Sequence, residues 1–133
     1  MTLQTIRVRD YMTRQVVALS PAMEILQALD TFVKKNISGA PVVDEAGQLI
    51  GILTEKDCMK VALNAAYHSE YGGLVSDYMT ASVISVSPDD GIVTLAGRFL
   101  EQRYHRYPVV EQGRLVGVIS RRDIVRALGK AWQ

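Results

Sequence analysis

The stretch Arg106-Tyr107-Pro108-Val109-Val110, continued by Gly113-Arg114-Leu115-Val116-Gly117-Val118-Ile119, decides the fold of this 133-residue chain. Two apolar runs on either side of a glycine turn predict a β-hairpin. Ser120 follows at once, and Asp123 lies three residues further on. A serine with an acid at that spacing is typical of a helix N-terminus, because each side chain can bind the backbone N–H group of the other. The stretch therefore predicts a hairpin that runs directly into a helix.

The same pattern occurs earlier in the chain, as Ala40-Pro41-Val42-Val43 followed by Gly47 to Asp57. Residues 8–44 and 75–111, aligned at a constant offset of 67, share thirteen identities in thirty-seven positions. All four prolines fall on two repeat positions, and the glycines of the hairpins coincide when one residue is dropped from the turn. Proline restricts φ and glycine frees it, so shared positions indicate shared backbone shape. The chain is a tandem repeat.

Each copy is predicted to contain a helical lead-in and a β-α-β-β-α unit. The first copy has a lead-in at 8–12, strands at 16–19, 40–44 and 48–53, a helix that starts at Ser20-Pro21 and a helix over 54–66. The second has a lead-in at 75–79, strands at 83–86, 107–111 and 114–119, and helices at 88–102 and 120–128. We expect an α+β fold with repeats at 1–66 and 75–133 and a linker at 67–74. Because about 55 residues bury a sheet poorly, the copies are expected to pack through their sheets about a pseudo-two-fold axis.

Composition narrows the class of protein. The hydrophobic fraction of 48% is ample for a core, and the lone cysteine, Cys58, excludes an internal disulfide and suits a reducing compartment. Its apolar helical setting indicates a buried core residue. No apolar run approaches the roughly 18 residues that cross a bilayer. We therefore expect a soluble cytoplasmic protein without membrane attachment.

The formal net charge of +1 argues against a general nucleic-acid binder. Basic residues nevertheless gather between Arg98 and Lys130. Three of them, Arg106, Arg121 and Arg122, lie at the predicted strand and helix starts of the second copy. Such a local cluster favours a small anion over a polyanion.

The sequence offers no set of catalytic or metal-binding residues. We find no Ser/His/Asp or Cys/His arrangement and no glycine-rich phosphate loop. Two histidines 37 positions apart and one cysteine do not make a metal site. The acidic pair Asp89-Asp90 falls at a predicted helix start, where the helix dipole stabilises negative charge. The sequence thus predicts a protein that is not an enzyme.

The repeated motifs resemble those of the CBS family. Asp10-Tyr11-Met12-Thr13, then Ser20-Pro21, then Gly39 to Asp44 and Gly51 to Asp57 together look like one CBS motif. The second copy matches at Tyr78-Met79-Thr80, at Pro108-Val109-Val110 and at Gly117 to Asp123. Over nearly its whole length the chain is similar to a stand-alone CBS-domain pair, or Bateman module.

This resemblance implies a regulatory module. Such pairs bind adenosine-containing ligands, among them AMP, ADP, ATP and S-adenosylmethionine, in the clefts between their repeats, and they require no cofactor. They commonly form homodimers shaped as a flat disc. A chain of this size is expected to act on a separate and unidentified partner protein. Trp132 is either a dimer contact or disordered.

The resemblance also implies particular site residues. The family's ribose-binding aspartate carries over to Asp57 and Asp123, with Thr54 and Ser120 as hydroxyl partners. The Gly-x-Pro element that lines the adenine pocket carries over to Ala40 and Pro41 and, less closely, to Tyr107 and Pro108, where Arg106 replaces the glycine. His105-Arg106-Tyr107-Pro108 resembles the His-Arg-Leu-Pro variant of adenylate-sensing members, in which the basic pair meets phosphate. The remaining candidates for phosphate binding are Lys56, Arg121 and Arg122.

Two alternatives stay open. Thr54-x-x-Asp57 and Ser120-x-x-Asp123 are also ordinary capping boxes, and one role does not exclude the other. The chain could also be a scaffold that dimerises with its clefts empty. That scaffold would keep its function in cells after Asp123→Ala and would carry no nucleotide when purified.

Overall fold

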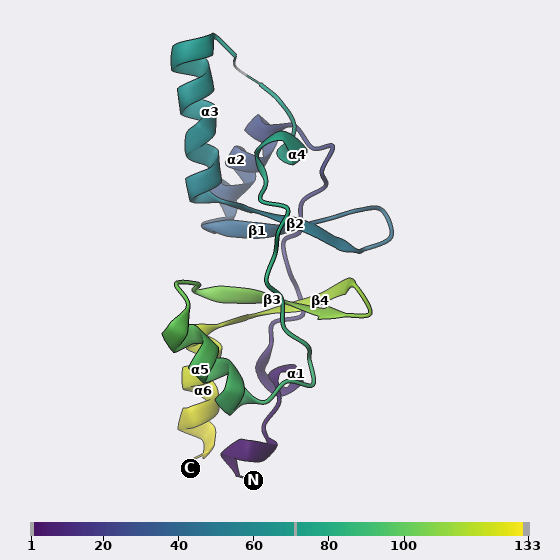
Figure 1. Cartoon of the computed structure of the whole chain (residues 1–133), viewed down its shortest axis with the longest axis vertical. Coiled ribbons are helices and arrows are strands. Elements are labelled where there is room, and N and C mark those ends of the chain that lie inside the picture. Colours follow the sequence, from purple (N-terminus) through teal and green to yellow (C-terminus); the bar gives the residue numbers. More distant parts are fainter. Residues whose placement is uncertain (1, 71, 132–133) are drawn as a thin grey trace. The chain divides into compact units, whose positions relative to one another are not determined.

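The computed structural model describes residues 2–70 and 72–131 (Figure 1). Met1, Tyr71, Gln133 and Trp132, which is a candidate dimer contact, lie outside the described residues. The chain forms two compact units that differ from the two sequence repeats. Unit 1 combines the chain up to Val16 with the chain from Ile84 onward, and unit 2 is residues Val17–Val83. Each unit therefore holds the lead-in of one repeat and the hairpin of the other.

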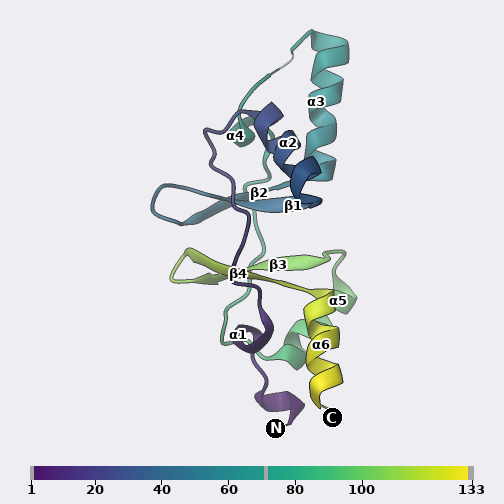
Figure 2. The same cartoon turned by 180° about the vertical axis from the view of Figure 1, so that it is seen from behind.

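The described residues of unit 2 form one antiparallel hairpin and three helices. The hairpin pairs β1 (Gly39–Val43) with β2 (Leu49–Thr54). Helices α2 (Ile25–Lys35) and α3 (Glu55–His68) cover the same face of this hairpin, together with the short α4 (Val75–Tyr78) (Figures 1 and 2). The core between them is apolar and includes Leu19, Ile25, Phe32, Val42, Leu53 and Cys58.

Unit 1 repeats this arrangement. Its hairpin pairs β3 (Arg106–Glu111) with β4 (Arg114–Ser120), and α5 (Ile92–Glu101) and α6 (Arg121–Ala131) lie on one face of it (Figure 2). The lead-in contributes the 3-10 turn η1 (Leu3–Thr5) and helix α1 (Val8–Tyr11). The core includes Val8, Leu95, Phe99, Tyr107, Val109 and Ile119. The predicted α+β class is confirmed.

The predicted strands at 16–19 and 83–86 are wrong in extent. In each segment the structure shows one bridging residue, Leu19 opposite Val42 and Val86 opposite Val109, both parallel. The chain passes from one unit to the other between Val16 and Val17, and again at Ile84. In both segments the bridging residue is the last one of the predicted strand, two or three positions past the unit boundary.

The predicted helix starts at Ser20-Pro21 and at residue 88 are also wrong. Helix α2 begins at Ile25 and α5 at Ile92, and turns occupy the residues before them. The backbone N–H of Ile25 donates to the carbonyl of Gly73, and that of Ile92 donates to Ile6. The residue directly before each helix is extended, because Glu24 bridges to Leu74 and Gly91 bridges to Arg7. Asp90 accordingly accepts from the Ser87 N–H group in a turn rather than lying at a helix start.

The lead-ins are attached through close contact with one glycine in each hairpin. Thr13 exchanges two backbone hydrogen bonds of 2.9 Å with Val118, and Thr80 does the same with Ile52. A Cβ atom on Gly117 would lie 2.8 Å from the Thr13 carbonyl oxygen. The repeat-equivalent Cβ on Gly51 would lie 2.7 Å from the sulfur of Met79. Because glycine has no Cβ atom, the lead-in can pack directly against the hairpin backbone at these two positions.

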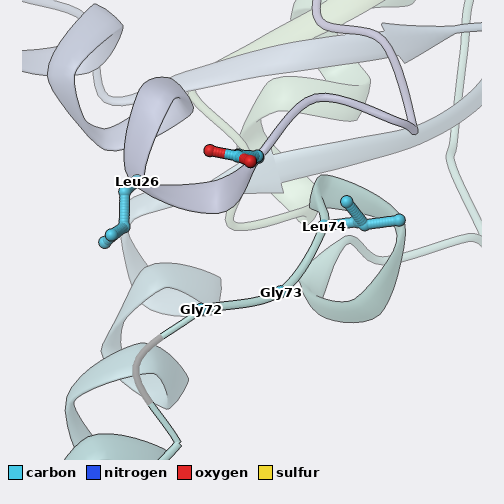
Figure 3. Close-up of a pocket in the computed structure, with 5 residues that line it drawn as sticks. Leu26, Gly72, Gly73 and Leu74 are labelled. Carbon is cyan, nitrogen blue, oxygen red and sulfur yellow. The ribbon is translucent and has the colours of Figure 1, made fainter.

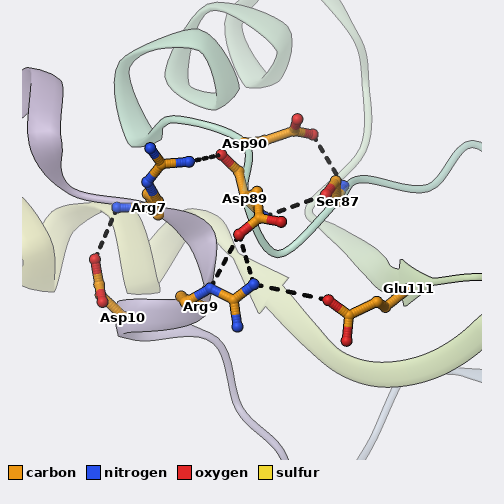
Figure 4. A network of polar contacts seen from close by, with 7 residues as sticks. All are labelled: Arg7, Arg9, Asp10, Ser87, Asp89, Asp90 and Glu111. Atoms are coloured by element: carbon orange, nitrogen blue, oxygen red, sulfur yellow. Dashed lines mark hydrogen bonds and ion pairs between the residues drawn. The ribbon is translucent and has the colours of Figure 1, made fainter.

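An exposed polar network also ties the lead-in of unit 1 to the turn before α5 (Figure 4). The Arg9 guanidinium binds the Asp89 carboxylate and lies 3.7 Å from Glu111. Arg7 donates to the Asp89 carbonyl at 3.0 Å. The bond to Asp89 raises the pKa of Arg9 above its usual value, so its charge is present at every physiological pH. Because these groups are exposed, salt is expected to screen their attraction.

We predict that Gly117→Ala destabilises the protein by about 1–3 kcal/mol, because the added methyl group meets backbone rather than a movable side chain. Urea unfolding measures the effect. The control is Gly97→Ala on α5, where a Cβ atom meets nothing within 4 Å. That change is expected to stabilise the helix by roughly 0.5–1 kcal/mol. Equal midpoints for Gly117→Ala and the parent would contradict the tight contact.

Candidate functional site

The carboxylate of Asp57 lies at the junction of β2 and α3. Its Oδ2 atom accepts from the Thr54 backbone N–H and from the Thr54 hydroxyl, both at 3.0 Å. Its Oδ1 atom accepts from the Thr80 hydroxyl at 3.2 Å and has the Lys60 ammonium at 3.5 Å. The residue is only 6% exposed. A capping box of the predicted kind thus holds a buried carboxylate in a fixed orientation.

Asp123 repeats this geometry in unit 1. Its Oδ2 atom accepts from the Ser120 N–H at 2.8 Å and from the Ser120 hydroxyl at 3.1 Å, while the Ser120 Oγ atom accepts from the Asp123 N–H at 3.2 Å. The residue is 7% exposed. Its Oδ1 atom accepts from the Arg126 guanidinium at 2.9 Å. Both predicted capping boxes therefore form, and the partners that the described residues offer to the Oδ1 atom are side chains in both.

The predicted phosphate-binding residues of unit 1 gather where β3 begins and α6 begins. The Arg121 N–H donates to the carbonyl of His105 at 3.1 Å, and the two side chains are in contact. Arg106 is exposed and is the register partner of Ser120, the residue that caps α6. Arg122 is exposed in the first turn of α6. The structure thus brings three arginines and a histidine close to the Asp123 capping box.

The equivalent place in unit 2 carries little charge. The same backbone bond joins Glu55 N–H to Ser38 at 3.0 Å, and Gly39 is the register partner of Thr54. Lys56 is exposed beside Glu55, so one positive and one negative side chain replace the basic cluster. The two units share a carboxylate geometry but differ in the charge around it.

The predicted adenine-pocket residues divide between the two faces of each hairpin. Ala40 and Tyr107 belong to the cores of their units. Tyr107 packs against Phe99 at 4.8 Å between ring centroids, and its hydroxyl donates to Gln102 at 2.6 Å. Burial raises the pKa of the Tyr107 hydroxyl. Since side chains alternate along a strand, Pro41 and Pro108 project from the opposite face of each hairpin, and both are buried as well.

Two neighbours of the aspartates are absent from the sequence-based site. Thr80 contacts Asp57 from the lead-in of the other repeat, and Arg126 contacts Asp123 from one turn further along α6. Thr80 repeats Thr13 after an identical Tyr-Met pair, which was a detectable signal. Arg126 and Lys60 occupy equivalent positions, each three residues after its aspartate. That spacing places both cations on the helix face of the carboxylate.

An open hollow of about 250 Å³ lies elsewhere in unit 2, where the start of α2 meets the segment before α4 (Figure 3). Its walls are Glu24, Leu26, Gly72, Gly73 and Leu74. None of the predicted site residues lines it. The buried aspartates, with fixed partners and adjacent cations, are therefore the stronger candidate site.

Other kinds of site find little support in the described part of the chain. No group of three or more His, Cys, Asp or Glu side chains there could hold a metal ion. Within the described residues, none of the helices combines the length and apolar character that a membrane crossing requires. Cys58 is buried in the unit 2 core, as predicted, and its burial raises the pKa of the thiol.

We predict that Cys58 reacts slowly with iodoacetamide in the folded protein. The thiolate is the reactive form, and a raised pKa together with burial reduces both its population and its access at pH 8. Mass spectrometry of timed samples measures the rate, and the same reaction in 6 M guanidinium chloride is the control. Equal rates in the two conditions would contradict the burial of this thiol.

Both repeats of the chain match one protein family. The CBS domain model matches the chain twice, at residues 8–64 and 75–130. The chain is 35% identical to the uncharacterized protein MJ1225 of Methanocaldococcus jannaschii over 94% of its own length, but it spans only 44% of that protein. It is 30% identical to the CBS domain-containing protein YhcV of Bacillus subtilis, covering 88% of this chain and 81% of YhcV.

Solved structures of similar size share the fold. The crystal structure of CBSX2 of Arabidopsis thaliana in complex with AMP matches with a TM-score of 0.84 and 28% identity, covering 96% of this chain and 98% of that one. The CBS domain pair of protein MJ0100, in complex with 5'-methylthioadenosine and S-adenosyl-L-methionine, matches with a TM-score of 0.76 and 28% identity. That match covers 95% of this chain and 98% of the MJ0100 pair.

Proposed function

We propose, since this chain belongs to the CBS-domain family, that it is a regulatory module that binds an adenosine-containing nucleotide at its Thr/Ser-x-x-Asp elements. The observation that carries the proposal is the pair of buried carboxylates, Asp57 and Asp123, held in one orientation by their capping boxes. A carboxylate is an acceptor that suits the adjacent hydroxyl groups of ribose. Similar CBS structures contain AMP, 5'-methylthioadenosine and S-adenosylmethionine, which all carry that ribose.

The unit 1 site is proposed to prefer a phosphorylated ligand. His105, Arg106, Arg121 and Arg122 lie around the start of α6, whereas the same positions of unit 2 hold Ser38, Gly39, Glu55 and Lys56. The planar guanidinium group can bind phosphate through two parallel hydrogen bonds. AMP, ADP or ATP therefore suits unit 1 better than S-adenosylmethionine does. A separate protein would then respond to the nucleotide-bound form.

We predict that AMP at about 100 times its dissociation constant stabilises the protein by about 2.7 kcal/mol, which raises the melting temperature by several degrees. Scans with AMP, ADP, ATP and S-adenosylmethionine measure the shift. Asp57→Asn with Asp123→Asn should abolish it. Asp30→Asn, which removes an exposed acid paired only with Lys34 on α2, should keep it. Unchanged melting with all four ligands at millimolar concentration would favour the alternative, a ligand-free scaffold.

Assembly into a homodimer is the second part of the proposal. Met59, Leu63 and Tyr67 follow one another at intervals of four along α3, and each is more than half exposed. In unit 1, Val125 on α6 is the repeat equivalent of Met59 and is also exposed. Val33 on α2 and its repeat equivalent Leu100 on α5 are exposed as well. Residues four apart share one helix face, so α3 presents a continuous apolar stripe. A second copy of the chain, carrying the same stripe, would cover it in a two-fold interface.

We predict that the protein is a dimer in solution and that Leu63→Glu shifts it to monomer, because a charge in the centre of an apolar interface loses its hydration. Light scattering coupled to gel filtration gives the mass. Gln4→Glu, which adds the same charge to an exposed residue of η1, is the control and should remain dimeric. A dimeric Leu63→Glu variant would exclude the α3 stripe as the interface.

A further inference from the structure

Arg126 holds the outer oxygen of the unit 1 carboxylate. Its Nη1 atom lies 2.9 Å from Asp123 Oδ1. Its guanidinium carbon lies 5.7 Å from the centre of the Tyr11 ring, a distance at which a cation is attracted to the ring face. The side chain is 58% exposed, whereas that of Asp123 is 10% exposed. A largely exposed cation is thus paired with a buried anion.

Arg126 competes with ribose for Asp123, because the carboxylate has a limited number of acceptor positions. A carboxylate has about four lone-pair positions, and the Ser120 N–H, the Ser120 hydroxyl and Arg126 already use three. Two adjacent ribose hydroxyls need two acceptor positions. The Ser120 N–H is part of the backbone and cannot turn away, and the Ser120 hydroxyl is fixed in the same capping box. Arg126, whose side chain is more than half exposed and can return to water, is the group that can leave at least cost.

In unit 2 the cation is held less closely by the carboxylate than in unit 1. The repeat-equivalent Lys60 lies at 3.5 Å from Asp57, the limit of a hydrogen bond, and the nearer donor to Oδ1 is the Thr80 hydroxyl at 3.2 Å. A hydroxyl group needs only a rotation to release its acceptor. Tyr78, the equivalent of Tyr11, is buried and its hydroxyl donates to the Gly72 carbonyl at 3.1 Å. The arginine that grips both a carboxylate and a tyrosine ring is thus a feature of unit 1.

We propose that Arg126 is a specificity-determining residue of the unit 1 site, an inference that rests on the nucleotide binding proposed above. The ribose hydroxyls displace Arg126 from Asp123, and the freed guanidinium binds the phosphate of the same ligand. A nucleoside breaks the ion pair and offers no replacement for it. A nucleoside phosphate offers Arg126 a new ion pair with its phosphate group. Arg126 therefore selects against unphosphorylated ligands.

The test compares adenosine with AMP by isothermal titration calorimetry. Asp57→Asn removes the carboxylate of unit 2, so that the heat reports on Asp123. Into that background we would place Arg126→Met, which keeps an unbranched side chain against Tyr11 without charge or donor. Adenosine should bind about two- to fivefold tighter, because the ion pair between Arg126 and Asp123 no longer has to break. AMP should bind roughly three- to tenfold more weakly, because a charge-assisted phosphate contact is lost. The ratio of the dissociation constant of adenosine to that of AMP should therefore fall by about six- to fiftyfold.

Matched variants separate this effect from charge and from folding. Arg114→Met removes one positive charge at the far end of β4 and should leave the ratio unchanged. Arg126→Lys should restore part of the preference for AMP. Melting scans establish that every variant is folded, and the wild-type background repeats the comparison if Asp57→Asn is unstable. An unchanged ratio, or an equal change for both ligands, overturns the role of Arg126 and leaves nucleotide binding intact. No binding of either ligand to the wild type overturns both.

Discussion

The close approach of each lead-in to a hairpin glycine is the constraint on which the rest of the structure depends. Thr13 and Thr80 each exchange two backbone bonds with a residue next to a glycine, and a single methyl group at Gly117 or Gly51 would occupy the space that the lead-in fills. Because the lead-in that docks on a hairpin comes from the other repeat, unit 1 combines two separate stretches of the chain, and unit 2 (Val17–Val83) runs from the first repeat into the second. The sequence repeats and the folded units therefore do not coincide, because each folded unit contains segments of both repeats.

This exchange also builds the candidate site. Thr80 belongs to the second lead-in, yet its hydroxyl reaches the carboxylate that closes the first hairpin. Tyr11 belongs to the first lead-in and lies under Arg126 of the last helix. Each buried aspartate is thus bounded by its own capping box on one side and by a lead-in or helix cation on the other. A change that loosens a lead-in would alter the surroundings of the carboxylate without touching it.

Much of this could be predicted from the sequence, for reasons that lie in single residues. Glycine and proline positions, the capping spacing of Thr54 with Asp57 and the apolar runs of the hairpins are all local signals, and each of these elements formed within a residue or two of its predicted place. The short helix around Asp10 is equally local, since its carboxylate accepts from the Arg7 N–H at 2.8 Å. The helix predicted to start at Ser20-Pro21 begins only at Ile25, because the Ile25 N–H group donates to Gly73, which is far away in the chain. The strand at 16–19 shrank to Leu19 because the chain changes units there.

The difference between the two sites follows from equally small changes. An arginine in place of lysine supplies a planar fork that can grip a carboxylate and rest on an aromatic ring, whereas an ammonium group at 3.5 Å acts as a loosely held point charge. The basic cluster at the start of α6 acts in the same direction, because it favours an anion beside the same carboxylate. The two copies of the fold can therefore share a ribose-binding carboxylate and still prefer different ligands, because the residues around the carboxylate differ. The geometry around Oδ1, rather than the capping box itself, is where the two copies have diverged.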